Sequence, residues 1–185
     1  AKGGSVAVLD PERARRHVAA ALRVVPFRGL EKFYDIAPLL RQPFVFNLTM
    51  ALWARTWADR GIDCVAGVDA RGFLLGMPLA LRLGLPFEMV RKAGKLPGAT
   101  ATGPEYVKEY AEAHGADALC AQTDGALQPG ARVLLVDDLV ATGGTMVAAV
   151  QLLHKMGAVV VACACLVEIE GLGAQAKVGA GVPIV

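Results

Sequence analysis

Residues 133–145 read VLLVDDLVATGGT, and this stretch decides the fold. It begins with four apolar residues, continues with two carboxylates at Asp137 and Asp138, and passes through small residues into a helical pattern. A buried strand that ends in polar residues and leads into a helix is the unit of an open α/β sheet. Such sheets bind ligands beyond the carboxyl ends of their strands. The stretch therefore predicts a parallel sheet and the edge at which its ligand lies.

The turn at 142–145 suits a phosphate group. Its two glycines allow backbone amides to approach the phosphate closely, its two threonines add hydroxyl donors, and the following helix adds its N-terminal dipole. Asp137 and Asp138 would repel a phosphate, but they suit sugar hydroxyls or a magnesium ion beside it. A ribose phosphate satisfies both halves of the stretch. A capped helix after a strand, with threonine and glycine as mere turn formers, leaves the paired acids unexplained.

The alternation of strand and helix extends over most of the chain. Apolar runs predict strands at 64–68, 86–90, 132–136, 159–167 and 182–185. Helical spacing predicts helices at 10–23, 43–60, 72–83, 145–156 and 172–177. Segment 27–41 is expected to be loop, and the three glycines and one proline of 94–103 predict a mobile loop. This order favours an α/β fold in which a central, mostly parallel sheet is flanked by helices.

Composition limits the class of protein. Apolar residues make up 55% of the 185 residues, but no run reaches the roughly 18 that a membrane helix needs. The N-terminal residues have no apolar segment of a secretory signal. The 19 basic and 17 acidic residues are interspersed and give a net charge of +2, so we expect no nucleic-acid partner. The four cysteines include no CxxC pair, which favours reduced thiols and a cytoplasmic protein.

The stretch 133–145 resembles the motif with which type I phosphoribosyltransferases bind PRPP (5-phosphoribosyl 1-pyrophosphate). That motif is a hydrophobic strand, two acids, two variable residues and ATGGT. The resemblance implies a type I phosphoribosyltransferase-like fold in one domain, with a small N-terminal hood over residues 1–45 and a mobile lid over 94–110. It implies that Asp137 and Asp138 hold Mg²⁺, directly or through sugar hydroxyls and water. The residues implied to bind PRPP or AMP in this stretch are Asp137, Asp138, Ala141, Thr142, Gly143, Gly144 and Thr145.

Three more segments resemble the adenine-specific branch of that family: FYDIAP at 33–38, GVDARGF at 67–73 and RKAGKLPG at 91–98. Ala141 stands where members that act on 6-oxopurines carry an aspartate, which speaks against hypoxanthine or guanine. The resemblance implies a homodimer that acts in purine salvage. It would convert adenine and PRPP, with Mg²⁺, into AMP and pyrophosphate.

The same resemblance implies roles for single residues. Phe33 and Leu139 would sandwich the purine, and backbone near Tyr34 would read its amino edge. Glu109 would move the proton of the base. The remaining residues would hold pyrophosphate or belong to the lid; they are Arg71, Arg91 and Lys95 for pyrophosphate, and Tyr106 and Tyr110 for the lid.

Alternatives stay open for several of these residues. Phe33 is as well explained by core packing, Arg71 by a surface position at a helix start and Arg91 by a solvated turn. Tyr34 replaces an arginine found in many members. Both serines of the usual lid pattern are missing, so Glu105 is a second candidate acid.

Three other functions compete with this interpretation. A PRPP-sensing regulator would need a DNA-binding domain, and about 30 residues before Phe33 are too few for one. An enzyme of the same superfamily could use a 6-oxopurine. A general nucleotide-binding α/β protein leaves the paired acids unexplained.

Overall fold

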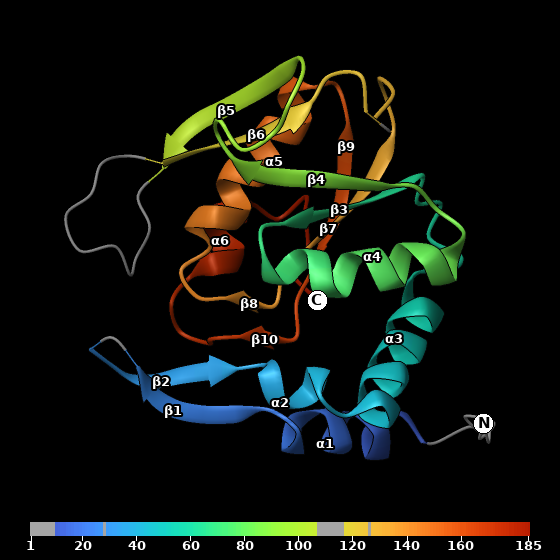
Figure 1. The fold of residues 1–185 in the computed structure, drawn as a ribbon, viewed down its shortest axis with the longest axis vertical. Helices are drawn as coiled ribbons and strands as arrows, with labels where there is room; N and C mark the ends of the chain where they lie inside the picture. The colour runs from blue at the N-terminus through green and yellow to red at the C-terminus, as the bar shows by residue number, and fades with distance from the viewer. Residues whose placement is uncertain (1–9, 28, 107–116, 126) are drawn as a thin grey trace. The chain divides into compact units, whose positions relative to one another are not determined.

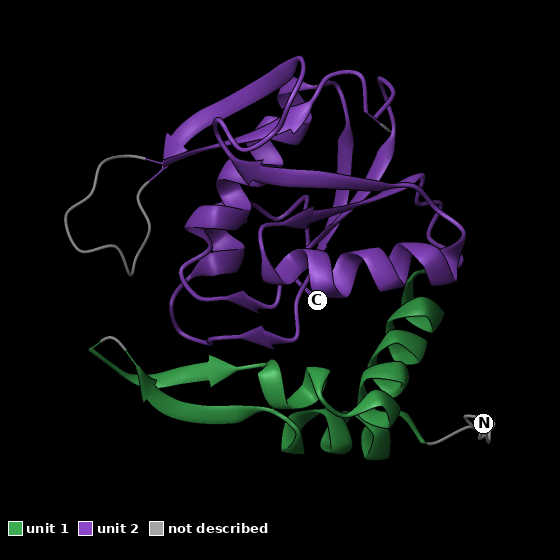
Figure 2. Ribbon diagram, in the orientation of Figure 1, with its two compact units in different colours: residues 1–57 green, residues 58–185 purple. Residues whose placement is uncertain are grey.

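The computed structural model describes residues 10–27, 29–106, 117–125 and 127–185 (Figure 1). It divides into two compact units, residues 1–57 and residues 58–185 (Figure 2). The boundary lies beyond residue 45, at which the sequence placed the end of the hood. Within the described residues, none of the helices has the length and apolarity needed to cross a bilayer.

The first unit packs its helices around a small core. Its elements are α1 (Pro11–Ala20), β1 (Arg23–Phe27), β2 (Leu30–Asp35), α2 (Ala37–Leu40) and α3 (Pro43–Trp57). The helix start expected at Asp10 is confirmed, because the Asp10 side chain accepts a hydrogen bond of 3.2 Å from the amide of Arg13. Ala14 of α1 is fully buried, and α1 packs against α3.

The expectation of a loop over 27–41 is wrong. β1 and β2 form an antiparallel hairpin that turns at Gly29, whose φ is 77°. The rings of Phe27 and Phe33 lie 4.9 Å apart, and an ion pair joins Arg23 to Asp35 across the hairpin. Hydrogen bonding between the two strands stabilises this hairpin. The sequence lacks the regular alternation of apolar and polar residues that would have indicated strands here.

The second unit is built on one large sheet with a small two-stranded sheet beside it. Its strands are β3 (Cys64–Val68), β4 (Phe87–Lys92), β5 (Thr100–Tyr106), β6 (Asp117–Gln122), β7 (Arg132–Val136), β8 (Leu139–Val140), β9 (Val159–Ala164) and β10 (Val167–Glu168). Its helices are α4 (Arg71–Leu83), α5 (Gly144–Lys155) and α6 (Ala174–Val178). Among the described residues the large sheet has the order β5-β6-β4-β3-β7-β9, and β8 pairs with β10.

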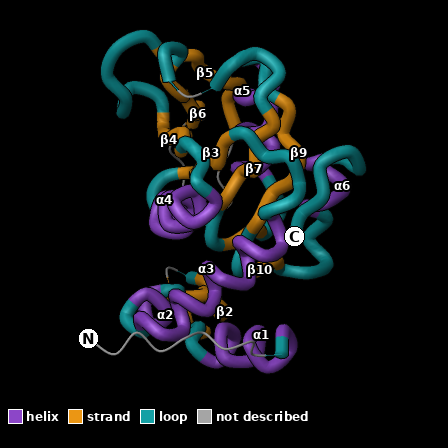
Figure 3. The backbone as a smooth tube through the Cα atoms, turned by 90° about the vertical axis from the view of Figure 1, so that its right-hand side faces the viewer, coloured by secondary structure: helices purple, strands orange, loops and turns teal. Residues whose placement is uncertain are grey.

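The middle of the large sheet confirms the predicted α/β fold. β4, β3, β7 and β9 run parallel, and β3 and β7 have the bounds expected from the sequence. α4 packs on one face of the sheet, against β3 and β7, and ends at the left-handed Gly84. α5 covers the other face, where Cys64, Ala66 and Val133 join the main apolar cluster (Figure 3).

The predicted loop over 94–103 is wrong from Thr100 onward. β5 pairs antiparallel with β6, a strand that the sequence analysis did not predict. The pairing register shifts between Thr102 and Glu105, where Gly103 and Pro104 interrupt the strand. A β carbon on Gly103 would lie 3.0 Å from Cβ of Leu152, so a glycine lets this bulge lie against α5. Gly103 and Pro104 are typical of loops, but here they form a bulge within a strand.

Two further expectations need correction near the C-terminus. The apolar run 159–167 splits, because β9 ends at Ala164 and β10 pairs separately with β8. The predicted strand 182–185 is reduced to a bridge between Cys163 and Ile184. All four cysteines are free and buried, and burial raises the pKa of the Cys163 and Cys165 thiols to about 12.

Glycines bring the start of α4 against the sheet. A β carbon on Gly67 would lie 2.8 Å from the carbonyl oxygen of Gly72. A β carbon on Gly72 would lie 2.5 Å from the carbonyl oxygen of Val136, the last residue of β7. The first turn of α4 therefore rests on the end of β7, where Asp137 begins.

We predict that Gly72→Ala destabilises the protein by about 1–3 kcal/mol, because the added methyl group forces backbone apart in a packed core. Thermal unfolding measures the effect as a lower Tm. The matched control is Gly181→Ala, since a β carbon at Gly181 has no heavy atom within 4 Å among the described residues. Equal Tm values for the two variants would show that the close approach of α4 carries no weight.

Candidate active site

A pocket of about 170 Å³ opens at the carboxyl ends of β3 and β7. Its walls come from the ends of these strands, the start of α4, the end of β5 and the turn before α5. The residues that line it are Val68, Asp69, Arg71, Tyr106, Asp137, Asp138, Leu139, Val140, Ala141, Gly143, Gly144, Thr145 and Met146. The stretch that opened the sequence analysis thus supplies most of one pocket within the second unit.

Residues 142–145, which the sequence predicts to bind a phosphate, form the turn that leads into α5; this turn is the predicted phosphate loop. Gly143 caps α5 with a φ of 84°, in the left-handed region that favours glycine. A β carbon on Gly143 would also lie 3.1 Å from Cα of Ala174, so α6 presses on this turn. The unpaired amides of the first turn of α5 and the helix dipole favour an anion here. Gly143, Gly144 and Thr145 line the pocket at this end.

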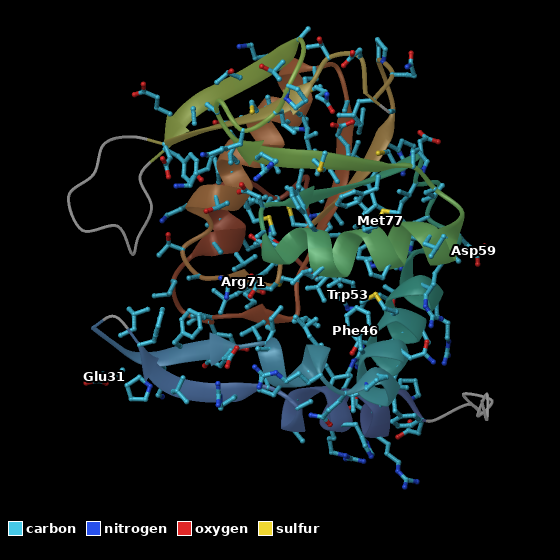
Figure 4. The ribbon with its side chains drawn as sticks, in the orientation of Figure 1. Glu31, Phe46, Trp53, Asp59, Arg71 and Met77 are labelled. Carbon is cyan, nitrogen blue, oxygen red and sulfur yellow. The ribbon has the colours of Figure 1, made fainter. Side chains whose placement is uncertain are left out.

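Two adjacent carboxylates lie at the other end of the loop. The amide of Asp138 donates a hydrogen bond of 2.9 Å to Oδ1 of Asp137. Asp138 is 1% exposed, and its Oδ2 lies 2.9 Å from Nη1 of Arg71. Arg71 is the first residue of α4 (Figure 4), so the start of that helix brings its charge to the acids.

The environment of the paired acids disfavours their ionised forms. Burial raises the pKa of Asp137 well above its ordinary value, and the charge of Asp138 raises it further. Burial also raises the pKa of Asp138, while Arg71 opposes that shift. A site of this kind gains from donors, such as sugar hydroxyls, or from a cation.

The oxygen ligands of the pair fit Mg²⁺, which is commonly held by one or two carboxylates together with substrate phosphates and water. Asp137 and Asp138 would hold it. In the described part of the chain there is no cluster of three or more His, Cys, Asp or Glu that could hold a metal ion.

Tyr106, predicted as a lid residue, closes one side of the pocket from the end of β5. Its hydroxyl is buried and lies near the side chain of Thr145, which also lines the pocket. Burial raises the pKa of Tyr106 to about 12, so the phenol stays protonated at neutral pH. It can donate a hydrogen bond to a ligand oxygen.

Asp69 is a pocket residue that the sequence analysis did not single out. It follows β3 directly, as Asp137 follows β7, and this position at a strand end could have indicated it. Its Oδ2 lies 3.6 Å from Nε of Arg91. Nη1 of Arg91 donates a hydrogen bond of 3.0 Å to the carbonyl of Lys95. The lining contains neither Arg91 nor Lys95, so Arg91 approaches the pocket through Asp69.

The residues predicted for the base site belong to different units. Leu139 lines the pocket, whereas Phe33 and Tyr34 lie in β2 and are half-buried in the first unit. Phe33 contacts Phe27, which agrees with the packing alternative, and the purine sandwich stays a prediction.

Two predicted lid residues, Glu109 and Tyr110, lie outside the described residues. Glu105, the second candidate acid, is exposed in β5. Thr142 belongs to the turn but is not part of the pocket lining.

A family model described as "Phosphoribosyl transferase domain" matches residues 40–177. The adenine phosphoribosyltransferase of Rhodospirillum rubrum is 51% identical over 140 residues, which cover 76% of this chain and 78% of the relative. The adenine phosphoribosyltransferase of Streptococcus uberis is 40% identical, with 88% of this chain and 91% of the relative covered. The chain belongs to the adenine phosphoribosyltransferase family.

Solved structures of this adenine phosphoribosyltransferase family agree with the fold. The enzyme of Saccharomyces cerevisiae, complexed with an imino-altritol bisphosphate and adenine, superposes with a TM-score of 0.84 and 32% identity, and covers 94% of this chain and 98% of its own. The enzyme of Trypanosoma brucei, in complex with AMP, pyrophosphate and ribose-5-phosphate, has a TM-score of 0.84 and 29% identity, with 93% and 77% covered. Phe33 and Tyr34 precede the span 40–177 that the family model matches.

We predict that Asp137→Asn raises the Tm at pH 7 by a few degrees. An unfolded Asp137 loses its proton near the ordinary value of 3.8, while the folded protein holds that proton to higher pH. The protein therefore loses stability as the pH rises from about 4 toward the raised pKa, because only the unfolded chain has released the proton in that interval, and asparagine removes this loss. The gain should shrink as the pH falls toward 4, because the unfolded chain begins to regain its proton there.

Thermal unfolding of the ligand-free protein between pH 4 and pH 8 checks this expectation. Asp59→Asn serves as the control, because Asp59 is exposed and its removal should leave Tm unchanged at every pH. A lower Tm for Asp137→Asn at pH 7 would mean that the ionised carboxylate stabilises the fold.

Proposed function

We propose that this chain transfers the 5-phosphoribosyl group of PRPP to adenine and gives AMP and pyrophosphate, as a step of purine salvage. The observation that carries the proposal is the pocket in which two adjacent carboxylates, Asp137 (half-buried) and Asp138 (buried), and a glycine-rich helix start lie at adjoining positions. One half suits a ribose and the other its phosphate. The family to which the chain belongs, and the AMP, pyrophosphate and ribose-5-phosphate bound to the Trypanosoma brucei relative, support the same substrates.

The phosphate loop holds the 5-phosphate through amides of 143–145 and so fixes the far end of the sugar. Asp137 and Asp138 then face the hydroxyls of the ribose. Mg²⁺ on these carboxylates would supply positive charge for the pyrophosphate that leaves. Because the sugar is held at both ends, its C1 meets the base already aligned, which removes much of the entropic barrier.

The bond from C1 to the pyrophosphate oxygen breaks while a bond from the base nitrogen to C1 forms. Positive charge develops on the sugar, and the leaving group takes the electron pair as an anion. Arg71, Arg91 and Lys95 are the cations proposed to hold that anion. Arg71 already faces the pocket, which supports its role most directly.

Ala141 supports adenine as the base. It lines the pocket, is 6% exposed and carries no group that titrates. The proton that the base nitrogen loses must therefore go elsewhere, and we assign its transfer to Glu109. Leu139 and Phe33 are proposed to enclose the ring, and backbone at Tyr34 to bind its amino group.

Residues 94–110 are proposed to act as a lid over this pocket. Tyr106 and Tyr110 belong to it, and the position of Tyr106 in the pocket wall supports the assignment. Closure would keep water from hydrolysing PRPP.

We predict that the protein releases pyrophosphate from PRPP and Mg²⁺ when adenine is present. Hypoxanthine, guanine and xanthine, each assayed separately, should give no release above background. Release with a 6-oxopurine would overturn the argument from Ala141. PRPP binding without release for any base would leave a PRPP-sensing binding protein.

The same assay tests the proton carrier. Glu109→Gln should lower kcat by about 10²–10⁴-fold, the range for general acid–base catalysis. Glu105→Gln is the matched control, because Glu105 is an exposed glutamate of the same segment. A full loss in Glu105→Gln with activity kept in Glu109→Gln would exchange the two roles.

We propose that the protein acts as a homodimer. Leu74, Met77 and Leu81 are spaced along one face of α4 and are 47%, 49% and 75% exposed (Met77 is labelled in Figure 4). An apolar stripe of this kind suits a second copy of the chain.

Met77→Glu should shift the protein to monomers in analytical ultracentrifugation, because it buries a charge in the proposed interface. Leu172→Glu, at an exposed leucine outside α4, should leave the dimer intact. A wild-type monomer, or a Met77→Glu dimer, would contradict this arrangement.

The four buried free thiols fit a reducing compartment. We therefore propose a cytoplasmic location, which cell fractionation would test.

A further inference from the structure

Two of the cations proposed for pyrophosphate face carboxylates of the pocket. Arg71 pairs with Asp138 at 2.9 Å, and Arg91 lies 3.6 Å from Asp69. Asp138 has a role with the sugar or Mg²⁺, whereas Asp69 has none in the proposed reaction. A carboxylate beside the site of a polyanion needs a physical reason, because it repels that anion.

The contact between Asp69 and Arg91 is incomplete. Nε of Arg91 is buried and has no hydrogen-bond partner among the described residues, since 3.6 Å to Oδ2 of Asp69 is too long for a hydrogen bond. A buried donor without a partner costs free energy. The charge attraction holds the guanidinium toward the pocket, but its donor stays available for an oxygen that can approach more closely.

The surroundings fix both partners in place. The amide of Asp69 donates a hydrogen bond of 2.9 Å to the carbonyl of Val90, which precedes Arg91 in β4. Nη1 of the same guanidinium donates a hydrogen bond to the carbonyl of Lys95. The side chain of Asp69 is 16% exposed and lines the pocket, while that of Arg91 is 36% exposed. Asp69 and the guanidinium of Arg91 are therefore held side by side next to the pocket.

We propose that Asp69 is a positioning residue that acts as an exchangeable counter-ion for Arg91. It holds the arginine at the pocket when pyrophosphate is absent and gives it up when a pyrophosphate oxygen reaches Nε. The exchange makes each binding event break an ion pair, so pyrophosphate binds less tightly than the cations alone would bind it, and leaves more readily as a product. This inference rests on the proposed function.

Titration calorimetry with inorganic pyrophosphate in magnesium buffer tests the exchange. Asp69→Asn keeps the shape of the side chain and removes its charge, so pyrophosphate should bind about two- to fivefold more tightly, the range expected for one partly exposed ion pair. The gain should decrease at high ionic strength. A residue with a merely structural role would weaken binding when replaced, not strengthen it.

Three further variants isolate the pair. Asp69→Glu keeps the charge and should stay close to wild type. Asp117→Asn removes the neighbouring ion pair of 3.0 Å with Lys92, outside the pocket lining, and should leave pyrophosphate affinity unchanged. In an Arg91→Gln background, Asp69→Asn should have no effect, because its partner is gone. Asp69→Ser replaces the asparagine variant if that variant does not fold.

Unchanged or weaker pyrophosphate binding by Asp69→Asn would overturn the proposal. An equal gain in the Arg91→Gln background would do so as well, since it would mean direct repulsion between Asp69 and the ligand. The assay with adenine and PRPP on the wild-type protein distinguishes a failure of the counter-ion role from a failure of the proposed function. Turnover there, with no effect of Asp69→Asn on affinity, would overturn the counter-ion role alone, whereas no turnover and no pyrophosphate binding would overturn both.

Discussion

The contact between the first turn of α4 and the end of β7 determines the position of the charged groups of the pocket. Gly72 has no side chain, so its backbone rests directly on the carbonyl of Val136. Arg71 precedes this glycine and Asp137 follows this valine, and the contact therefore brings a guanidinium to two carboxylates. A larger residue at 72 would move the arginine away from the acids. Packing in the core and charge in the site are set by the same two backbone positions.

The charged residues of the pocket are suited to a bound ligand rather than to one another. Asp69, Asp137 and Asp138 all line it, and Arg71 is the cation in its wall. Burial makes the ionised form of the paired acids costly, as the raised pKa of Asp137 shows. The fold tolerates this loss of stability where ligand binding offsets it, because the ligand brings both hydrogen-bond donors and anionic groups.

The sequence predicted those parts of the fold in which local pattern and tertiary structure agree. β3 and β7 are buried on both faces, so their continuous apolar runs gave the right bounds. The phosphate loop was predictable because glycine and threonine are needed there for local reasons. β5, β6 and the β1–β2 hairpin were missed because distant or adjacent strands stabilise them by hydrogen bonds that no single segment reveals. Asp69 was missed although it follows β3 directly, as Asp137 follows β7, because its contact with Arg91 joins residues that are distant in sequence.

The two edges of the large sheet affect how the molecule can associate. Open edge strands offer unpaired backbone groups to other chains and promote aggregation. β5 is interrupted by Pro104, which lacks an amide hydrogen, within a bulge. β9 is shielded by the C-terminal segment, whose backbone bonds to Cys163 and Cys165. Neither edge of this sheet invites strand addition, so growth into fibrils by extension of the large sheet is opposed at both ends.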